Sequence, residues 1–151
     1  MLAKQPRPGL YSPEHEQFRE TVRRYFKDAV EPRVREWEAN GGVTRELFTE
    51  AARYGILAAG IPEEYGGGGG DFLHHAIVHE EHGYTPAGAQ IGGGLDIDGS
   101  TYLFLYAGTV EQKKEWLPRY AKGEVIAEVC FTEPHSGSDL GDVRSYAKRD
   151  G

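Results

Sequence analysis

Apolar residues recur every three or four positions along most of the first 123 residues, which is the spacing of one face of an α-helix. Ser12 is a favoured N-cap residue and Pro13 suits a first helical turn, so the first helix is expected to begin there. Pro32 has no N–H to donate, and we expect a kink or break at that position. The inward face of this helix is expected to carry Phe18, Val22, Tyr25 and Ala29.

Later helices are marked by capping residues and by glycines at their ends. After Gly41 and Gly42, Thr44 is expected to cap a short helix that Gly55 closes. The side chains of this helix that are expected to lie in the core are Leu47, Phe48 and Ala51.

Two more helices complete the predicted helical region. Asp71 should cap the first of them, which Gly83 ends. Thr109 and Gln112 form a capping box that opens the second, and Gly123 follows its end. The apolar side chains that are expected to face inward from these two helices are Phe72, Ala76, Ile77, Trp116, Leu117 and Tyr120.

The pattern changes after residue 124, because the run from 125 to 132 is β-rich. We expect the first strand or two of a β segment there. Pro134 and Gly137 break the run and leave an irregular loop that carries the hydroxyls of Ser136 and Ser138. Composition alone is more typical of a plain turn. However, such a loop can also hydrogen-bond the polar edge of a planar cofactor or a phosphate.

The order of residues in this loop resembles a known signature. Residues 132–139 read Thr-Glu-Pro-His-Ser-Gly-Ser-Asp, which is similar to the flavin-binding signature of the acyl-CoA dehydrogenases. Three other segments resemble that family in the same order, namely residues 61–67, 78–81 and 107–118. Arg19, Pro32 and Trp37 are placed as in the family's opening helices. The resemblance therefore spans residues ~11 to 151.

The resemblance implies a mainly α fold: an N-terminal helical bundle of the acyl-CoA dehydrogenase type followed by an incomplete β segment. Residues 1–11 would be an N-terminal extension, residues 12–124 the helical domain and residues 125–151 the beginning of the middle β domain. Family members are more than twice as long, and their catalytic glutamate lies in the second half. We therefore expect a truncated piece that has no catalytic base and is inactive alone.

The family chemistry is the flavin-dependent formation of a double bond between C2 and C3 of an acyl-CoA thioester, with FAD as cofactor. By resemblance, Val129, Phe131, Thr132, Gly137 and Ser138 hold the pyrimidine edge or the ribityl chain of the flavin. Ser138 is also similar to the serine that contacts the CoA portion of the substrate. His135 and Ser136 depart from the family pattern, in which glycine or asparagine and then alanine are commoner.

The resemblance also implies partners and leaves alternatives open. Electron-transfer flavoprotein or a similar acceptor would be a partner, and the full-length protein would be a homo-oligomer. Acyl-CoA oxidases, nitroalkane oxidases and flavin-dependent monooxygenases share the scaffold, and a non-catalytic helical interaction domain is a further alternative. The three glycines Gly92–Gly94 precede the segment at 107–118, and they could leave room for a bulky acyl group or simply fray a helix start.

No metal site is expected from the sequence. His75 and His79, or His79 and His82, would share a helix face, but residues 79–82 miss the His-Glu-x-x-His spacing by one position. We therefore expect these histidines on an exposed face. The residues from Asp96 onward lack the glycine and the acid of a calcium loop. Gly66–Gly70 has no phosphate-binding order and is interpreted as a flexible connector.

Composition restricts the class of partner. Seventeen basic and twenty-four acidic residues give a net charge of −7, which argues against binding to nucleic acid or to anionic membranes. The single cysteine, Cys130, cannot form an internal disulfide and is expected in the core. The N-terminus has no signal-peptide pattern, and no apolar run is long enough to span a bilayer, so a cytoplasmic protein is expected.

Overall fold

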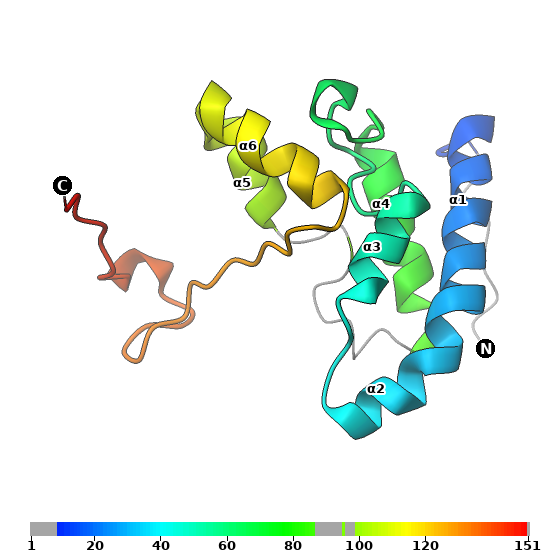
Figure 1. The fold of residues 1–151 in the computed structure, drawn as a ribbon, viewed down its shortest axis with the longest axis horizontal. Coiled ribbons are helices and arrows are strands. Elements are labelled where there is room, and N and C mark those ends of the chain that lie inside the picture. Colours follow the sequence, from blue (N-terminus) through cyan, green and yellow to red (C-terminus); the bar gives the residue numbers. More distant parts are fainter. Residues whose placement is uncertain (1–8, 87–94, 96–98, 151) are drawn as a thin grey trace.

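Helices dominate the structure, as expected for a mainly α fold. The computed structural model describes residues 9–86, 95 and 99–150, and Figure 1 shows a group of helices followed by an irregular C-terminal segment. The α-helices are α1 Pro13–Tyr25, α2 Val34–Asn40, α3 Glu46–Arg53, α4 Phe72–Gly83, α5 Gly99–Ala107 and α6 Val110–Ala121. The short helical turns are η1 Phe26–Val30 of π type and η2 Glu31–Arg33, η3 Glu63–Tyr65 and η5 Leu140–Asp142 of 3₁₀ type.

Helix α1 begins where the sequence predicts. The backbone N–H of His15 donates to the Oγ of Ser12 at 3.3 Å, and the N–H of Ser12 donates to the Nδ1 of His15 at 3.0 Å. This is a capping box with histidine in the place where glutamate or glutamine is usual. Pro32 does not end the helical path, because the chain passes through the π turn η1 and the 3₁₀ turn η2 into α2. These turns change the hydrogen-bond spacing next to the proline, which has no N–H.

Helix α3 starts later than expected. Arg45, not Thr44, is its N-cap residue, and no side chain caps the helix. Thr44 contributes its carbonyl oxygen, which accepts from the N–H of Leu47 at 3.2 Å. The expected end is confirmed, since Gly55 follows the helix with φ +69°. Leu47 and Ala51 are buried in the core, and Phe48 is half-buried.

Helix α4 is capped by Asp71 as predicted, but the prediction that Phe72 lies in the core is wrong. The Oδ1 of Asp71 accepts from the N–H of Leu73 at 2.9 Å. Ile77 is fully buried, whereas Phe72 is 77% exposed. Phe72 lies about 140° around the helix from Ile77, away from the face that packs on α1. Ala76 is only half-buried for the same reason.

Helix α6 matches its prediction closely. The N–H of Gln112 donates to Thr109 Oγ1 at 3.2 Å, and the N–H of Thr109 donates to Gln112 Oε1 at 2.8 Å, which completes the capping box. Leu117 and Tyr120 are buried, and Trp116 is half-buried. Beyond the helix, Gly123 adopts φ +70°.

The core lies among the helices, and the half-buried Ala127 of the segment after α6 packs against it. Helices α1 and α4 run side by side and share the largest contact between elements (Figure 1). The hydroxyl of Tyr25 donates to the carbonyl oxygen of Leu47 at 2.9 Å and ties α1 to α3 inside the core. The largest fully buried side chains are Trp37, Tyr25, Phe26, Leu47, Ile56, Leu57, Ile61, Ile77, Leu95 and Leu117. Within the described ranges, no helix is both long enough and apolar enough to cross a membrane.

The segment from 125 to 132 contains no helix, as expected, but the predicted strand is absent. Among the described residues the β interactions are limited to an isolated bridge between Glu133 and Ser136. Side chains at 125, 127 and 129 are half-buried, and those at 126, 128 and 130 are exposed. The segment therefore has the alternating burial of a β-strand but pairs with no other strand in the described part of the chain. Cys130 is consequently exposed, and its expected place in the core is wrong.

The glycine loop at 66–70 is packed and is not the flexible connector that was expected. The N–H groups of Gly68 and Gly70 donate to the carbonyl oxygens of Ala58 and Ala59 at 2.9 and 2.8 Å. A Cβ atom at Gly67 would lie 2.1 Å from the carbonyl oxygen of Ile61. Glycine is therefore required for the close approach of two backbones. The donors of this loop are engaged, so it does not form a phosphate cradle.

Candidate functional site

A groove of about 400 Å³ lies beside α5, the start of α6 and the extended segment that follows α6. Its lining is mainly apolar: Leu103, Phe104, Ala107, Gly108, Gln112, Glu128, Val129 and Cys130. Helix α5 is apolar on most of its surface and leaves Leu103 52% exposed and Tyr106 79% exposed. Such large exposed apolar side chains are typical of a binding surface.

The loop after this segment is held in shape by one carboxylate. Glu133 Oε2 accepts from the N–H of Arg144 at 2.9 Å, and its Oε1 accepts from the N–H of Ser145 at 2.8 Å. The Ser145 side chain, followed by the two backbone N–H groups, holds the pKa of Glu133 below its usual range. Glu133 is therefore an ionised structural acceptor that closes the loop from 133 to 145.

His135 and Ser136, the two residues that depart from the pattern of the family that the loop resembles, also stabilise this loop. Ser136 is buried, and its hydroxyl donates to the carbonyl oxygen of Asp139. The Nε2 atom of His135 lies 3.1 Å from the carbonyl oxygen of Asp142. Asp139 Oδ1 accepts from the N–H of Gly141 at 3.1 Å and begins the turn η5. The sequence pattern did not reveal these contacts.

The five residues predicted to bind the cofactor occupy two places. Val129 lines the groove, and Phe131 and Thr132 follow it along the chain with Phe131 54% exposed. Gly137 and Ser138 lie beyond the bridge from Glu133 to Ser136 and do not line this groove. In the described part of the chain, the hydroxyls of Thr132 and Ser138 have no hydrogen-bond partner. Both residues are exposed, but of the five predicted residues Val129 is the one that lines the groove.

This arrangement suits the binding of a planar molecule with an apolar body and a polar edge. The one carboxylate among the described lining residues is Glu128, whose Oε1 already accepts from the N–H of Val129 at 3.3 Å. We assign no catalytic acid or base to the groove. The glycines Gly92–Gly94, which were proposed to shape an acyl pocket, lie outside the described residues.

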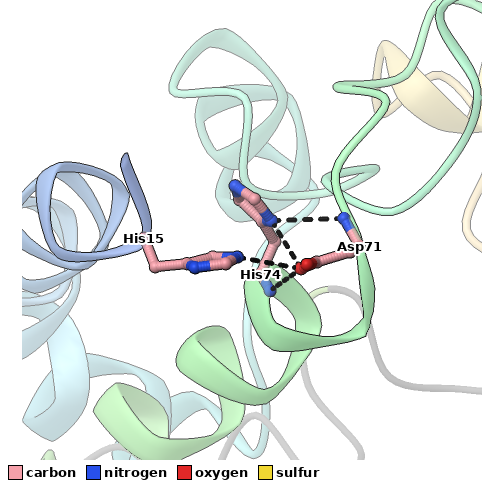
Figure 2. Close-up of side chains that lie close together, drawn as sticks. All are labelled: His15, Asp71 and His74. Carbon is pink, nitrogen blue, oxygen red and sulfur yellow. Dashed lines mark hydrogen bonds and ion pairs between the residues drawn. The ribbon is translucent and has the colours of Figure 1, made fainter. Parts of the chain in front are cut away.

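A second cluster joins the beginnings of α1 and α4 and was missed by the sequence analysis. His15, Asp71 and His74 point toward one another (Figure 2), and each offers a ligand atom within 4.8 Å of the others. The signal for it was the pair of spacings Ser12-x-x-His15 and Asp71-x-x-His74. Ser12 and Asp71 were each predicted to cap a helix, but nothing in the sequence indicated that the two helix starts meet.

The histidines weighed in the sequence analysis are arranged differently from the expectation of one exposed face. His79 is exposed, but His82 is buried and stacks on Phe26 with ring centroids 5.7 Å apart. The rings of His75 and His79 are 4.8 Å apart. Burial, followed by the charges of His75 and His82, lowers the pKa of His79.

Comparison with known proteins points to one family. The family model "Acyl-CoA dehydrogenase, N-terminal domain" matches residues 12–124. The chain is 40% identical over 144 residues to the mitochondrial long-chain specific acyl-CoA dehydrogenase of Sus scrofa, covering 94% of this chain and 33% of that protein. The chain thus spans about a third of the length of such curated relatives.

Solved structures agree with this match. An acyl-CoA dehydrogenase from Bacillus anthracis in complex with FAD is similar with a TM-score of 0.79 and 33% identity, over 88% of this chain and 23% of that chain. A glutaryl-CoA dehydrogenase from Mycobacterium smegmatis in complex with FADH2 has a TM-score of 0.79 and 26% identity, over 93% of this chain and 36% of that chain.

Proposed function

Since the chain belongs to the acyl-CoA dehydrogenase family, we propose that it supplies the helical N-terminal part of a flavin-dependent acyl-CoA dehydrogenase. The observation that carries this proposal is the apolar groove beside α5, whose lining includes Val129 and Cys130, just before the loop at 132–139 in the sequence. A family match over residues 12–124 supports this reading of the groove, because α5 and α6 belong to the matched part of the chain.

The cofactor in this proposal is FAD, which relatives of this fold contain in their solved structures. The donor set fits, because the hydroxyls of Thr132 and Ser138 are exposed and unpartnered while Val129 offers apolar contact. Bound FAD would supply the capacity to accept a hydride. Thr132 and the neighbouring backbone N–H groups would orient the ring and would stabilise negative charge at its polar edge.

The loop contributes rigidity to this binding. Glu133 holds Arg144 and Ser145, and Ser136 holds Asp139, so the loop shape is defined by its own hydrogen bonds. A preformed loop loses less conformational freedom when a ligand binds. Ser138, at the outer side of this loop, would also contact the CoA portion of an acyl-CoA substrate.

The whole protein would act on an acyl-CoA thioester, pass electrons to electron-transfer flavoprotein or a similar acceptor, and assemble as a homo-oligomer. We propose no catalytic base within residues 1–151, and we place the protein in the cytoplasm. The matched family model and the relative at 40% identity are both acyl-CoA dehydrogenases, and this supports the enzyme over a non-catalytic helical module.

The experiment compares two proteins: the 151-residue chain and the product of the complete reading frame that encodes it. We expect the complete product to co-purify with FAD through gel filtration and the chain alone to elute without it. The reason is that a large cofactor needs many oriented contacts at once. Stoichiometric FAD on the chain alone, or none on the complete product, contradicts this assignment. Rapid oxygen consumption by the complete product would favour an oxidase on the same scaffold.

A further inference from the structure

Three side chains of types that can ligate a metal ion meet where α1 and α4 begin (Figure 2). His15 is in the first turn of α1, Asp71 is the N-cap of α4, and His74 is in the first turn of α4. The Nε2 of His15 and the Nδ1 of His74 each lie 3.0 Å from the Oδ1 of Asp71. Two elements that are 56 residues apart in sequence are thereby joined at one carboxylate.

We propose that His15, Asp71 and His74 form a binding site for a divalent transition metal ion of the Zn²⁺ type. Two imidazoles and one carboxylate are a common zinc ligand set, and such sites leave the fourth position to water. Ligand atoms that surround Zn²⁺ tetrahedrally lie ~3.4 Å apart, so the two 3.0 Å contacts need to open slightly and the two ring nitrogens, which lie within 4.8 Å of each other, need to move to that spacing. This site is independent of the apolar groove beside α5.

The surroundings leave one side of the cluster open to a metal ion. The imidazoles of His15 and His74 are only 10% and 14% exposed, whereas the side chain of Asp71 is 59% exposed. Tyr11 packs against His15 with ring centroids 6.1 Å apart, and Phe18 packs against His74 at 5.1 Å. Aromatic rings thus pack against both imidazoles, and the exposed side of Asp71 is where an ion can enter.

The protons can be arranged for metal binding. Without metal, the Nδ1 of His15 accepts from the N–H of Ser12 at 3.0 Å, so its Nε2 carries the proton and donates to Asp71. Metal binding requires the other tautomer, in which Nδ1–H donates to the Oγ of Ser12, an atom only 2.8 Å away. Such a hydrogen bond from the second ring nitrogen is usual for a metal-bound histidine. The N–H of Asp71, which now donates to His74, is exposed and can turn to water.

Asp71 decides whether the site can hold a cation. The N-termini of α1 and α4 both point at the cluster and carry partial positive charge, which opposes a metal ion. The negative charge of the carboxylate offsets that effect. In the variant Asp71→Asn the N-cap hydrogen bonds would persist, since asparagine caps a helix as well as aspartate does, but the charge would be lost. This substitution therefore separates capping from metal binding.

Glutamine substitutions at His15 and His74 also separate helix capping from metal binding. Glutamine at the third helical position preserves a capping box, so His15→Gln and His74→Gln remove a metal ligand and keep the helix starts. His79→Ala is the matched control, because His75 and His79 are also adjacent on α4 but lie outside the cluster.

The test is calorimetric titration of the 151-residue chain and these variants with Zn²⁺, together with the visible spectrum of the Co²⁺-loaded protein. We expect one Zn²⁺ per chain and a four- or five-coordinate Co²⁺ spectrum. The Kd should rise by about tenfold or more in His15→Gln, His74→Gln and Asp71→Asn, since loss of a group that only hydrogen-bonds a metal ligand already costs about 10–100-fold, and it should be unchanged in His79→Ala. Circular dichroism checks that each variant is folded.

The proposal is overturned if the folded wild-type chain binds no Zn²⁺ at micromolar concentration. It is also overturned if binding is unchanged in all three cluster variants that remain folded, or if His79→Ala alone abolishes it. In each case the cluster would serve only to cap and tether the two helices.

Discussion

Arg19 of α1 donates a hydrogen bond to Glu81 of α4 at 3.2 Å, in a contact where the two side chains are only 9% and 3% exposed. Arg23 also donates to the Oε1 of Glu81 at 3.0 Å, and Arg19 reaches Glu80 at 2.7 Å. The carboxylate of Glu81 is therefore surrounded by two guanidinium groups from the same helix. This buried network holds α1 against α4, the two helices that share the largest contact in the structure.

Replacement of Glu81 by alanine should destabilise the chain strongly. It leaves Arg19 partly uncompensated in a buried place, and loss of one partner of a buried ion pair typically costs about 3–5 kcal/mol. Because Glu80 still pairs with Arg19, we expect the lower end of that range. Urea unfolding followed by circular dichroism measures the change.

The matched control for this substitution is Glu20→Ala. Glu20 pairs with Arg23 at 2.6 Å, but the side chain of Glu20 is 69% exposed. Exposed pairs contribute about 0–1 kcal/mol, so this variant should unfold almost as the wild type does. Equal losses in Glu20→Ala and Glu81→Ala would show that the buried network has no special role.

Gly123→Ala should destabilise the chain more than Gly41→Ala does. Both glycines adopt positive φ, at +70° and +79°, and alanine there costs roughly 1–2 kcal/mol. At Gly123, the new Cβ would also lie 2.7 Å from the carbonyl oxygen of Phe48, whereas nothing lies within 4 Å at Gly41. Crowding of this kind adds about 1–3 kcal/mol. Thermal unfolding of both variants measures the difference, and a larger loss in Gly41→Ala would contradict the close approach of the Gly123 backbone to Phe48 of α3.

Acidification should remove the contribution of Asp71 to stability. The side chain of His74 and then that of His15, with two backbone N–H groups, lower the pKa of the Asp71 carboxyl. A carboxyl whose pKa is lower in the folded state stabilises the fold above its unfolded pKa of about 3.9. That contribution declines as the pH falls through the folded pKa. The difference in Tm between the wild type and Asp71→Asn should therefore be present at pH ~5 and shrink below pH ~4. A difference that grows steadily on acidification to the lowest accessible pH would contradict this.

Local signals in the sequence were sufficient to find three of the helix starts, those of α1, α4 and α6. Ser12, Asp71 and Thr109 each cap the helix that was predicted to follow, because a cap depends on residues three positions away. Thr44 failed as a cap, since a carbonyl oxygen can replace a hydroxyl at a helix start.

Non-local features could not be found from the sequence. The extended segment at 125–132 has strand alternation, but a strand also needs a partner, and none pairs with it in the described part of the chain. The exposed Phe72, the exposed Cys130 and the meeting of His15 with Asp71 depend on how distant segments pack. The domain boundaries and the cofactor roles of the loop residues stay predictions.

Thr132→Val should weaken flavin binding in the complete protein more than Ser136→Ala does. Thr132 is exposed with a free hydroxyl, and loss of one donor to a bound ring corresponds to about 1–3 kcal/mol if it becomes buried and is not replaced. Ser136 is buried and donates to Asp139 inside the loop, so its removal should lower the stability of the loop first. Equilibrium titration with FAD gives the two affinities, and hydrogen exchange of residues 133–145 reports the loop. Equal FAD affinity and equal flavin reduction rates in the two variants would count against the role of Thr132.

The most direct test of the proposed function is anaerobic addition of acyl-CoA thioesters to the FAD-loaded product of the complete reading frame. We expect the visible absorption of the oxidised flavin to bleach, with one 2-enoyl-CoA formed per flavin reduced. Thioesters of different chain length and branching then identify the acyl group. A flavin that stays oxidised with every acyl-CoA, yet is reduced by dithionite, would contradict the assignment of this protein as an acyl-CoA dehydrogenase.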